Sequence, residues 1–201
     1  MAQKVGRSLL VCSLGNPGTR YQNTRHSVGH LILDKLIEDN RTSLNAVEVP
    51  EIKGELLLGR SKQFNGGESN SVLGLYKPRA YMNESGRPVF QMWKLFRQKI
   101  YNSQLVLIHD DLSLKVGQVK VEIGGPTRGH NGLKSVYQYI EPQKITKIRV
   151  GISRPESRNP YEVAEYVLAK FPPDELSVIQ EDSYPIIWNI LASIEGRRLE
   201  L

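Results

Sequence analysis

Residues 105–111 read Leu-Val-Leu-Ile-His-Asp-Asp, an apolar run that passes directly into polar side chains. A continuously apolar run is typical of a strand whose two faces are both covered, as in the parallel part of an α/β sheet. Similar runs lie before and after it, and they alternate with stretches in which apolar residues recur at helical spacing. This alternation predicts an α/β fold, with polar groups at the carboxyl end of the 105–108 strand.

The neighbouring segments predict the other elements. Strand-like runs lie at residues 9–12, 56–58, 72–76, 119–123 and 148–152, and helical spacing marks residues 24–39, 89–96 and 133–140. Asn23 and Thr24 are candidate caps for the first helix, and the turn at residues 65–68 suits a hairpin. From residue 159 the pattern indicates helices with breaks at Pro172-Pro173 and Pro185. We expect one domain over residues 1–201, with a core at about 9–170 and a helical segment at about 171–201. Its architecture should be a three-layer sandwich, a mixed central sheet with helices on both faces.

Composition excludes several classes of protein. The 201 residues include 27 Lys and Arg against 21 Asp and Glu, a formal charge of +6, and 39% are hydrophobic. These values exclude a disordered, collagenous or coiled-coil chain, and they favour a polyanionic partner. The single cysteine, Cys12, makes no internal disulfide, and no run approaches the roughly 20 apolar residues that span a bilayer. The opening Met1 to Arg7 is too short and polar for a signal peptide. We therefore expect a soluble cytoplasmic protein that does not bind membranes.

Polar residues gather where a cleft is expected. Ligands of open α/β sheets bind beyond the carboxyl ends of the strands, which here carry Asn16, Asp110 and the loop with His130 and Asn131. His26 lies near the start of a predicted helix, where the helix dipole lowers the pKa of an imidazole and a nearby carboxylate raises it. The sequence lacks the nucleophile elbow, the phosphate-binding loops and the zinc-binding H-E-x-x-H pattern. The remaining residues suit activation of water without a protein nucleophile.

Each of these residues also has a purely structural interpretation. Any one of the asparagines suits a turn or a helix cap. His26 and His30 are four residues apart, with Asp34 four further on, a spacing shared by metal ligands, but a satisfied half-buried His30 is favoured and no metal is predicted. Asp110 and Asp111 are neighbours on an extended segment, so only one of them should enter the cleft.

Basic residues lie in or beside the predicted loops and strands. They form either a phosphate-binding rim or an ordinary solvated surface, and the sequence favours neither. The set comprises Lys77, Arg79, Lys120, Arg128, Lys134, Arg149, Arg154 and Arg158.

Five motifs occur in a fixed order along the chain. They are Leu14-Gly15-Asn16-Pro17-Gly18 with Tyr21, then Thr24-Arg25-His26, Tyr81-Met82-Asn83-Glu84-Ser85-Gly86, His109-Asp110-Asp111-Leu112 and Gly129-His130-Asn131-Gly132. Over about residues 9–170 the chain resembles the bacterial-type peptidyl-tRNA hydrolase family. The resemblance implies hydrolysis of the ester between a peptide and the 3′ end of tRNA, without metal or cofactor, by a monomer that recycles tRNA from prematurely released peptidyl-tRNA.

The same resemblance implies a role for individual residues. His26 would be the base that activates water, and Asp110 its orienting partner. The implied substrate-binding residues are Asn16, Tyr21, Tyr81, Met82, Asn83, His130 and Asn131. From the basic residues named above, and not from the resemblance, we predict contacts to the tRNA backbone phosphates by Lys120, Arg128, Lys134, Arg149 and Arg158.

The chain departs from the family pattern at several positions. Ser27 stands where the family usually has Asn, Ala80 where it commonly has Thr, and Ser13 where it has Gly. The loop Pro126-Thr127-Arg128 is bulkier than usual. Because relatives of this fold serve in organellar RNA splicing, the alternative is a catalytically weak RNA-binding scaffold, with a mitochondrial location as the alternative compartment. A small-substrate esterase is a third interpretation, which leaves the basic residues without a role.

Overall fold

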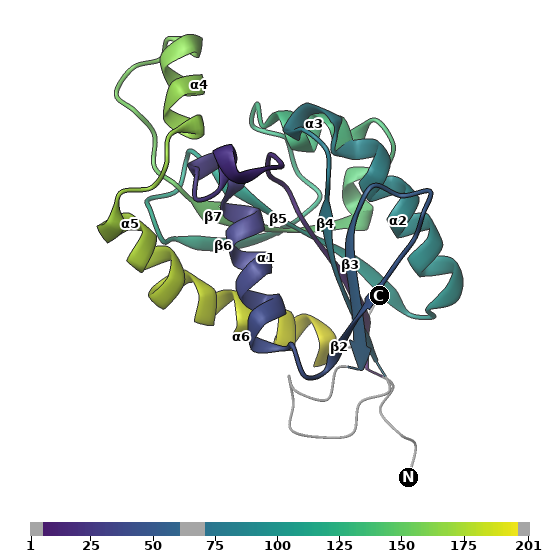
Figure 1. Cartoon of the computed structure of the whole chain (residues 1–201). Coiled ribbons are helices and arrows are strands. Elements are labelled where there is room, and N and C mark those ends of the chain that lie inside the picture. Colours follow the sequence, from purple (N-terminus) through teal and green to yellow (C-terminus); the bar gives the residue numbers. More distant parts are fainter. Residues whose placement is uncertain (1–5, 61–70, 197–201) are drawn as a thin grey trace.

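Residues 6–60 and 71–196 are described by the structure, which is a computed structural model (Figure 1). Within them, seven strands form one mixed sheet in the order β2-β3-β4-β1-β5-β7-β6. The strands are β1 (Ser8–Ser13), β2 (Leu44–Val47), β3 (Gly54–Arg60), β4 (Val72–Pro78), β5 (Ser103–Asp111), β6 (Val119–Ile123) and β7 (Ile145–Gly151). Strands β4, β1, β5 and β7 run parallel, whereas β2, β3 and β6 complete the sheet through antiparallel pairs.

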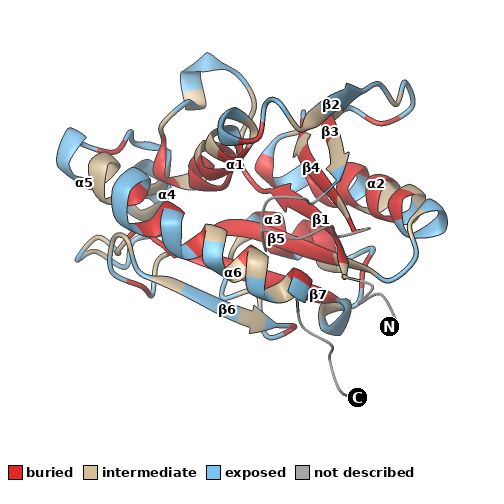
Figure 2. Ribbon diagram, turned by 90° about the horizontal axis from the view of Figure 1, so that it is seen from below, coloured by how far each residue is buried: buried red, intermediate tan, exposed pale blue. Residues whose placement is uncertain are grey.

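Helices cover both faces of this sheet. The helices are α1 (Val28–Asp39), α2 (Gly86–Lys99), α3 (Asn131–Tyr137), α4 (Pro160–Leu168), α5 (Pro173–Val178) and α6 (Tyr184–Gly196). Residues of α1 and α6 share one hydrophobic cluster with the sheet, and residues of α2 and α3 share the other. Figure 2 shows the buried strands lying between these helices. The predicted three-layer α/β sandwich is therefore confirmed.

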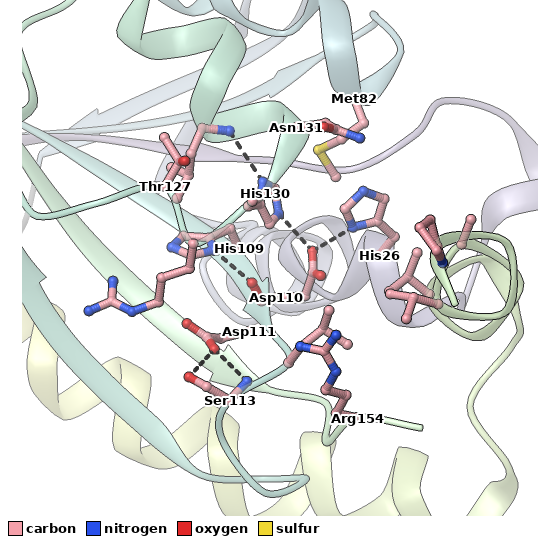
Figure 3. Close-up of a pocket in the computed structure, with 18 of the residues that line it drawn as sticks. His26, Met82, His109, Asp110, Asp111, Ser113, Thr127, His130, Asn131 and Arg154 are labelled. Carbon is pink, nitrogen blue, oxygen red and sulfur yellow. Dashed lines mark hydrogen bonds and ion pairs between the residues drawn. The ribbon is translucent and has the colours of Figure 1, made fainter. Parts of the chain in front are cut away.

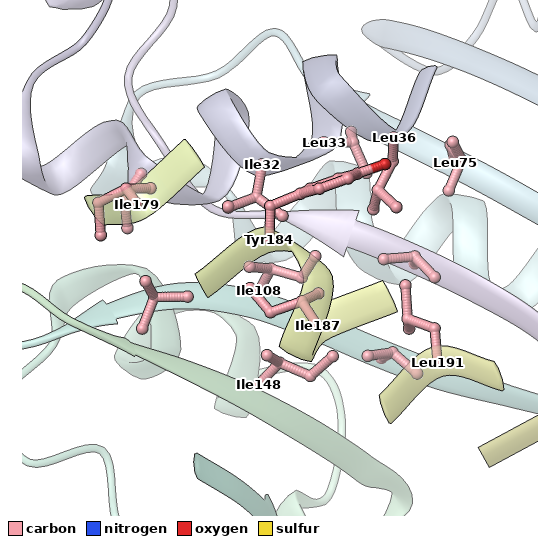
Figure 4. Close-up of a cluster of buried hydrophobic side chains, with 14 of the residues drawn as sticks. Ile32, Leu33, Leu36, Leu75, Ile108, Ile148, Ile179, Tyr184, Ile187 and Leu191 are labelled. Atoms are coloured by element: carbon pink, nitrogen blue, oxygen red, sulfur yellow. The ribbon is translucent and has the colours of Figure 1, made fainter. Parts of the chain in front are cut away.

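The central strands contribute side chains to both clusters in alternation. On β5, Val106 and Ile108 join the α1/α6 side, whereas Leu105 and Leu107 join the α2/α3 side. This follows from the two-residue period of a strand, and it explains why the run is apolar at every position. In Figure 4 Ile108 of β5 lies close to side chains of α1 and α6. Burying an aliphatic side chain of this size contributes about 1.5–3 kcal/mol, so the packing fixes β5 and the polar residues at its end.

Most of the predicted elements are present, with differences at β5, at the start of α1 and at one edge of the sheet. β5 continues through Asp111, which pairs with Gly151, so His109, Asp110 and Asp111 belong to the strand. Asn23 and Thr24 do not cap α1, because the 3₁₀ turn η2 (Arg25–Ser27) intervenes and α1 begins at Val28. Strand β2, the edge strand beside β3, was not predicted.

The two proline sites behave differently. Pro172-Pro173 lies in the predicted break, between the end of α4 at Leu168 and the start of α5 at Pro173. Pro185 does not end a helix, because a π-helical turn, η5 (Ile179–Ser183), joins α5 directly to α6 and Pro185 is the second residue of α6. The predicted hairpin turn at residues 65–68 lies outside the described residues, although β3 and β4 do pair antiparallel. No helix among the described residues is long and apolar enough to cross a membrane.

Candidate active site

Asp110, at the carboxyl end of β5, is the centre of a buried polar cluster. Its side chain is only 3% exposed, and its Oδ1 accepts hydrogen bonds from His26 Nδ1 and His130 Nε2, both at 2.9 Å. Figure 3 shows the two imidazoles converging on this carboxylate. We call His26, Asp110 and His130 the histidine cluster. It joins turn η2, strand β5 and the start of α3, which are far apart in the sequence.

The surroundings of His130 fix where its proton lies. Its Nδ1 accepts a hydrogen bond from the backbone N–H of Leu133 at 3.2 Å and so caps the start of α3. A nitrogen that accepts cannot carry a proton, so the proton of neutral His130 is on Nε2 and is donated to Asp110. Both ring nitrogens of His130 are therefore committed to the fold.

His26 differs because only one of its nitrogens is used. The ring donates from Nδ1 to Asp110, which leaves the lone pair of Nε2 available in the neutral tautomer. Figure 3 shows Nε2 on the side of the ring that faces Met82 and Asn131. Burial lowers the pKa of His26, but the charge and the hydrogen bond of Asp110 outweigh it and raise the pKa above its ordinary value. Burial in turn raises the pKa of Asp110, yet the two histidines hold it well below the usual range, so Asp110 is a carboxylate.

A cavity of about 900 Å³ opens in front of this cluster. Its polar lining includes Asn16, Asn83 and Asn131, and its apolar wall is formed by residues of α4. The apolar lining residues of α4 are Pro160, Val163, Ala164, Val167 and Leu168. The sequence analysis missed this wall, although the helical spacing of Val163, Val167 and Leu168 was a usable signal. A cavity with an apolar wall and a few convergent polar groups is typical of a binding site for a small group or chain end.

Asn16 is held in place by two hydrogen bonds. Its side-chain oxygen accepts from the backbone N–H of Met82 at 2.9 Å, and its own backbone N–H donates to Ser27 Oγ at 3.2 Å. The carbonyl end of the amide is therefore occupied, and its NH₂ group remains available to a ligand. Ser27, which departs from the family pattern, is 3% exposed and serves to anchor the loop that carries Asn16.

The structure brings most of the predicted substrate-binding residues to the cavity, but not the two tyrosines. Met82, Asn83, His130 and Asn131 line it together with Asn16. Tyr21 and Tyr81 are absent from its lining and pack edge to face, with ring centroids 6.4 Å apart. Tyr81 instead lines a neighbouring hollow that shares Asn83 with the cavity.

The predicted tRNA contacts divide into exposed and paired cations. Lys120, Lys134 and Arg158 are exposed, and Arg158 lines the cavity, as does Arg154. Arg128 also lines the cavity, but both of its terminal nitrogens donate to the carboxylate of Glu122, at 2.8 and 2.9 Å.

Arg149 was predicted to contact phosphate, and the structure contradicts this. Its side chain is only 9% exposed, and its Nε donates to Asp111 Oδ2 at 2.7 Å. Asp111 is therefore held by Arg149, whereas Asp110 is held by the two histidines. Both aspartates nevertheless line the cavity, so the prediction that only one of them enters it was wrong. The fully buried Lys147, which the sequence analysis did not single out, pairs with Glu122 at 2.8 Å across the β6–β7 ladder. We call Asp111, Glu122, Arg128, Lys147 and Arg149 the ion-pair cluster.

The predicted metal-ligand spacing on α1 does not assemble a site. His30 is buried and its Nδ1 shares a hydrogen bond with Ser13 Oγ at 2.8 Å, while Asp34 pairs with Lys77 on the surface. Burial, followed by the charge of Lys77, lowers the pKa of His30 to about 3, so it is neutral. Among residues 6–60 and 71–196, the ligand-type atoms that do gather are those of the histidine cluster, within 4.8 Å of one another. Hydrogen bonds already join them to one another.

Fold and site together define an α/β protein in which a buried carboxylate at a strand end orients a histidine toward a cavity. The sequence model of the peptidyl-tRNA hydrolase family matches residues 10–194. The chain belongs to this family.

Individual relatives agree with this assignment. The peptidyl-tRNA hydrolase of Brevibacillus brevis is 38% identical over 172 residues, which cover 86% of this chain and 84% of that protein. That of Aquifex aeolicus is 32% identical over 186 residues, covering 92% and 90%. A crystal structure of a variant of the Acinetobacter baumannii peptidyl-tRNA hydrolase matches with a TM-score of 0.79 at 26% identity, covering 96% of this chain and 91% of that one.

Proposed function

We propose that the chain hydrolyses the ester bond between a peptide, or an N-blocked aminoacyl group, and the 3′ end of tRNA. Its role would be to recycle tRNA from peptidyl-tRNA released by the ribosome. The relatives named above are peptidyl-tRNA hydrolases. The observation that carries the proposal is the 2.9 Å contact between His26 Nδ1 and Asp110, which leaves His26 Nε2 as a free base beside the cavity.

In this mechanism His26 Nε2 removes a proton from water as the water oxygen attacks the ester carbonyl carbon. The negative charge of Asp110 stabilises the imidazolium that forms. When the tetrahedral intermediate collapses, the bond to the ribose oxygen breaks and that oxygen takes the proton from His26. One water is consumed, and the products are a peptide carboxylic acid and a tRNA with a free hydroxyl.

The asparagines would bind the reacting group. The free NH₂ of Asn16 and the amides of Asn83 and Asn131 line the same cavity. Amide groups offer donors to the carbonyl oxygen, where negative charge develops, and to the main chain of the peptide. Because Asp110 already controls the pKa of His26, the groups that bind the substrate need no charge of their own. Neutral amides fit this requirement.

The exposed cations would contact the tRNA backbone. Arg154 and Arg158 line the cavity, and Lys120 and Lys134 are exposed. Arg128 is available to a phosphate only if it leaves Glu122, and Arg149 is not part of the proposal. The enzyme would act as a monomer, because every group in the mechanism comes from one chain. We propose the cytoplasm as its location.

The test is release of the acyl group from N-acetyl-aminoacyl-tRNA and from unblocked aminoacyl-tRNA, each with a metal chelator present. We expect rapid cleavage of the blocked substrate alone, and a steep loss of rate with added salt as phosphate contacts weaken. Cleavage that is insensitive to salt would indicate an esterase for small substrates. Binding of tRNA without cleavage of either substrate would indicate the RNA-binding scaffold, an interpretation that the intact His26–Asp110 pair does not favour.

A further inference from the structure

Arg25 immediately precedes the proposed base, and its side chain lies outside the cavity. The residue is 8% exposed and does not line the cavity. Its guanidinium donates from Nη2 to Glu175 Oε2 at 2.8 Å and from Nη1 to the backbone carbonyl of Lys170 at 3.2 Å. An arginine buried with this many partners is positioned by the fold, and it cannot be a contact for tRNA phosphates.

Aromatic rings complete the surroundings of this guanidinium. Arg25 Cζ lies over the ring of Tyr166, 4.3 Å from its centroid, and 5.4 Å from the ring centroid of Phe171. Contacts of this kind stabilise a guanidinium most when they are desolvated, as here. Tyr166 belongs to α4, whose other face forms the apolar wall of the cavity.

The backbone joins the same two segments. The N–H of Arg25 donates to the carbonyl of Ala169 at 3.0 Å, and the N–H of Phe171 donates to the carbonyl of Asn23 at 2.9 Å. Thr24 and Lys170 form an antiparallel bridge between these bonds. The turn that carries His26 is therefore attached both to the end of α4 and, through Glu175, to α5.

We infer that Arg25 is a positioning residue, which holds the turn bearing His26 and the α4 wall of the cavity as one rigid unit. It does not touch the reacting atoms. It keeps His26 at hydrogen-bond distance from Asp110. It also fixes the position of His26 relative to a substrate that lies against α4. The inference rests on the proposed function, since it concerns the geometry of that reaction.

The decisive variant is Arg25→Lys, which keeps the positive charge but loses the planar guanidinium and its second hydrogen bond. We expect kcat for N-acetyl-aminoacyl-tRNA to fall at least about tenfold, because small misplacements of a catalytic group are costly, while KM changes by less than about threefold. Tyr166→Leu should reproduce this loss. The two substitutions combined should cost less than the product of their separate effects, because they disrupt one interaction.

A second measurement does not depend on turnover. The pKa of His26 is read from an NMR titration of its imidazole in wild type and in Arg25→Lys. We expect the pKa of His26 to fall toward its ordinary value in Arg25→Lys. Because lysine preserves the positive charge at residue 25, such a fall would report a longer distance between His26 Nδ1 and Asp110. Lys35→Gln is the matched control, since Lys35 also pairs with a carboxylate, Asp39, and also lies over a ring, Tyr184, but on α1 away from the turn. It should change neither kcat nor the pKa of His26.

The outcomes separate the two proposals. Wild-type protein that fails to cleave N-acetyl-aminoacyl-tRNA overturns the proposed function, whatever the variants do. Active wild type with a folded Arg25→Lys variant that retains normal kcat and a normal His26 pKa overturns the positioning role alone. Should Arg25→Lys fail to fold, Glu175→Ala decides in its place, because it removes one partner and leaves both rings. A smaller loss of kcat of the same kind supports the role, and unchanged kcat contradicts it.

Discussion

The histidine cluster and the ion-pair cluster begin at adjacent residues of β5, yet they use their carboxylates in different ways. Asp110 accepts two N–H groups from imidazoles and leaves one further nitrogen, His26 Nε2, free beside the cavity. Asp111 is opposed by a permanently charged guanidinium, that of Arg149. A carboxylate that faces titratable imidazoles can tune a proton acceptor, whereas one that faces a fixed cation can only hold structure.

His26→Ala should have the largest effect on activity of the changes in either cluster. This change removes the free nitrogen while leaving Asp110 its second partner, His130. A general base contributes about 10²–10⁴ in rate, so we expect kcat for N-acetyl-aminoacyl-tRNA to fall by that factor. Thermal unfolding should stay close to wild type, and near-normal turnover would show that the free nitrogen is not the base.

Asp110→Asn tests how the carboxylate tunes that base. The amide keeps an oxygen that accepts a hydrogen bond, but it lacks the charge, so we expect kcat to fall about 10²-fold, at the lower end of the range for a base. The sign of the pH effect follows from the raised pKa of His26. Activity requires neutral His26 and rises as pH increases through that pKa, so loss of the charge moves the acid limb to lower pH. An acid limb that stays in place would mean that it does not report His26.

Arg149→Gln tests the other cluster, and its expected effect is on stability. It leaves the carboxylate of Asp111 buried without its cation, a change that costs about 3 kcal/mol or more of unfolding free energy. Urea denaturation measures this, with Lys77→Gln as the control, because the Lys77–Asp34 pair is partly exposed and contributes about 0–1 kcal/mol. Arg149→Gln should not raise KM or flatten the salt dependence. A variant with unchanged stability, a raised KM and a flatter salt dependence would show that Arg149 contacts phosphate.

The contrast also shows what the sequence could and could not predict. The strands and helices were predictable because apolar periodicity is local, and β5 is apolar at consecutive positions for that reason. The pairing of His26 with Asp110, 84 residues away, followed only from resemblance to a family. The β6–β7 register places Lys147 opposite Glu122, and no local sequence pattern predicts that register.

Two sets of predicted contacts show the limit of the sequence for the same physical reason. Arg149 looked like a surface cation because the sequence does not reveal which carboxylate it meets. Substrate contacts by Tyr21 and Tyr81 stay a prediction, because the sequence did not reveal that the two rings pack against each other beside the cavity. Side-chain partners depend on tertiary contacts, which composition and spacing do not specify.

The smallest expected effect concerns Glu122, the acid that joins three cations of the ion-pair cluster. Its hydrogen bonds with Arg128, together with the charge and hydrogen bond of Lys147, lower its pKa from 4.5 to about 2. A group whose pKa is depressed by folding stabilises the protein above its unfolded pKa, and that contribution is lost as pH falls through the folded value. Glu122 therefore contributes fully above about pH 4.5 and loses its contribution toward about pH 2. The carboxylate of Glu122 is itself partly exposed, and glutamine keeps an oxygen that accepts from Lys147 and Arg128, so we expect only about 1 kcal/mol.

Unfolding of Glu122→Gln in urea at pH 6 and at pH 3 measures this contribution. The variant should be less stable than wild type at pH 6, and the difference should shrink at pH 3, where part of the wild-type contribution is already lost. Asp110 and Asp111 also have lowered pKa values, so both proteins should still lose stability in acid. A difference of the same size at both pH values would place the effect in packing and not in the charge of Glu122. In that case packing, and not the charge of Glu122, would keep the cations of the ion-pair cluster in place. The two clusters would then not differ in how they use the charge of a carboxylate.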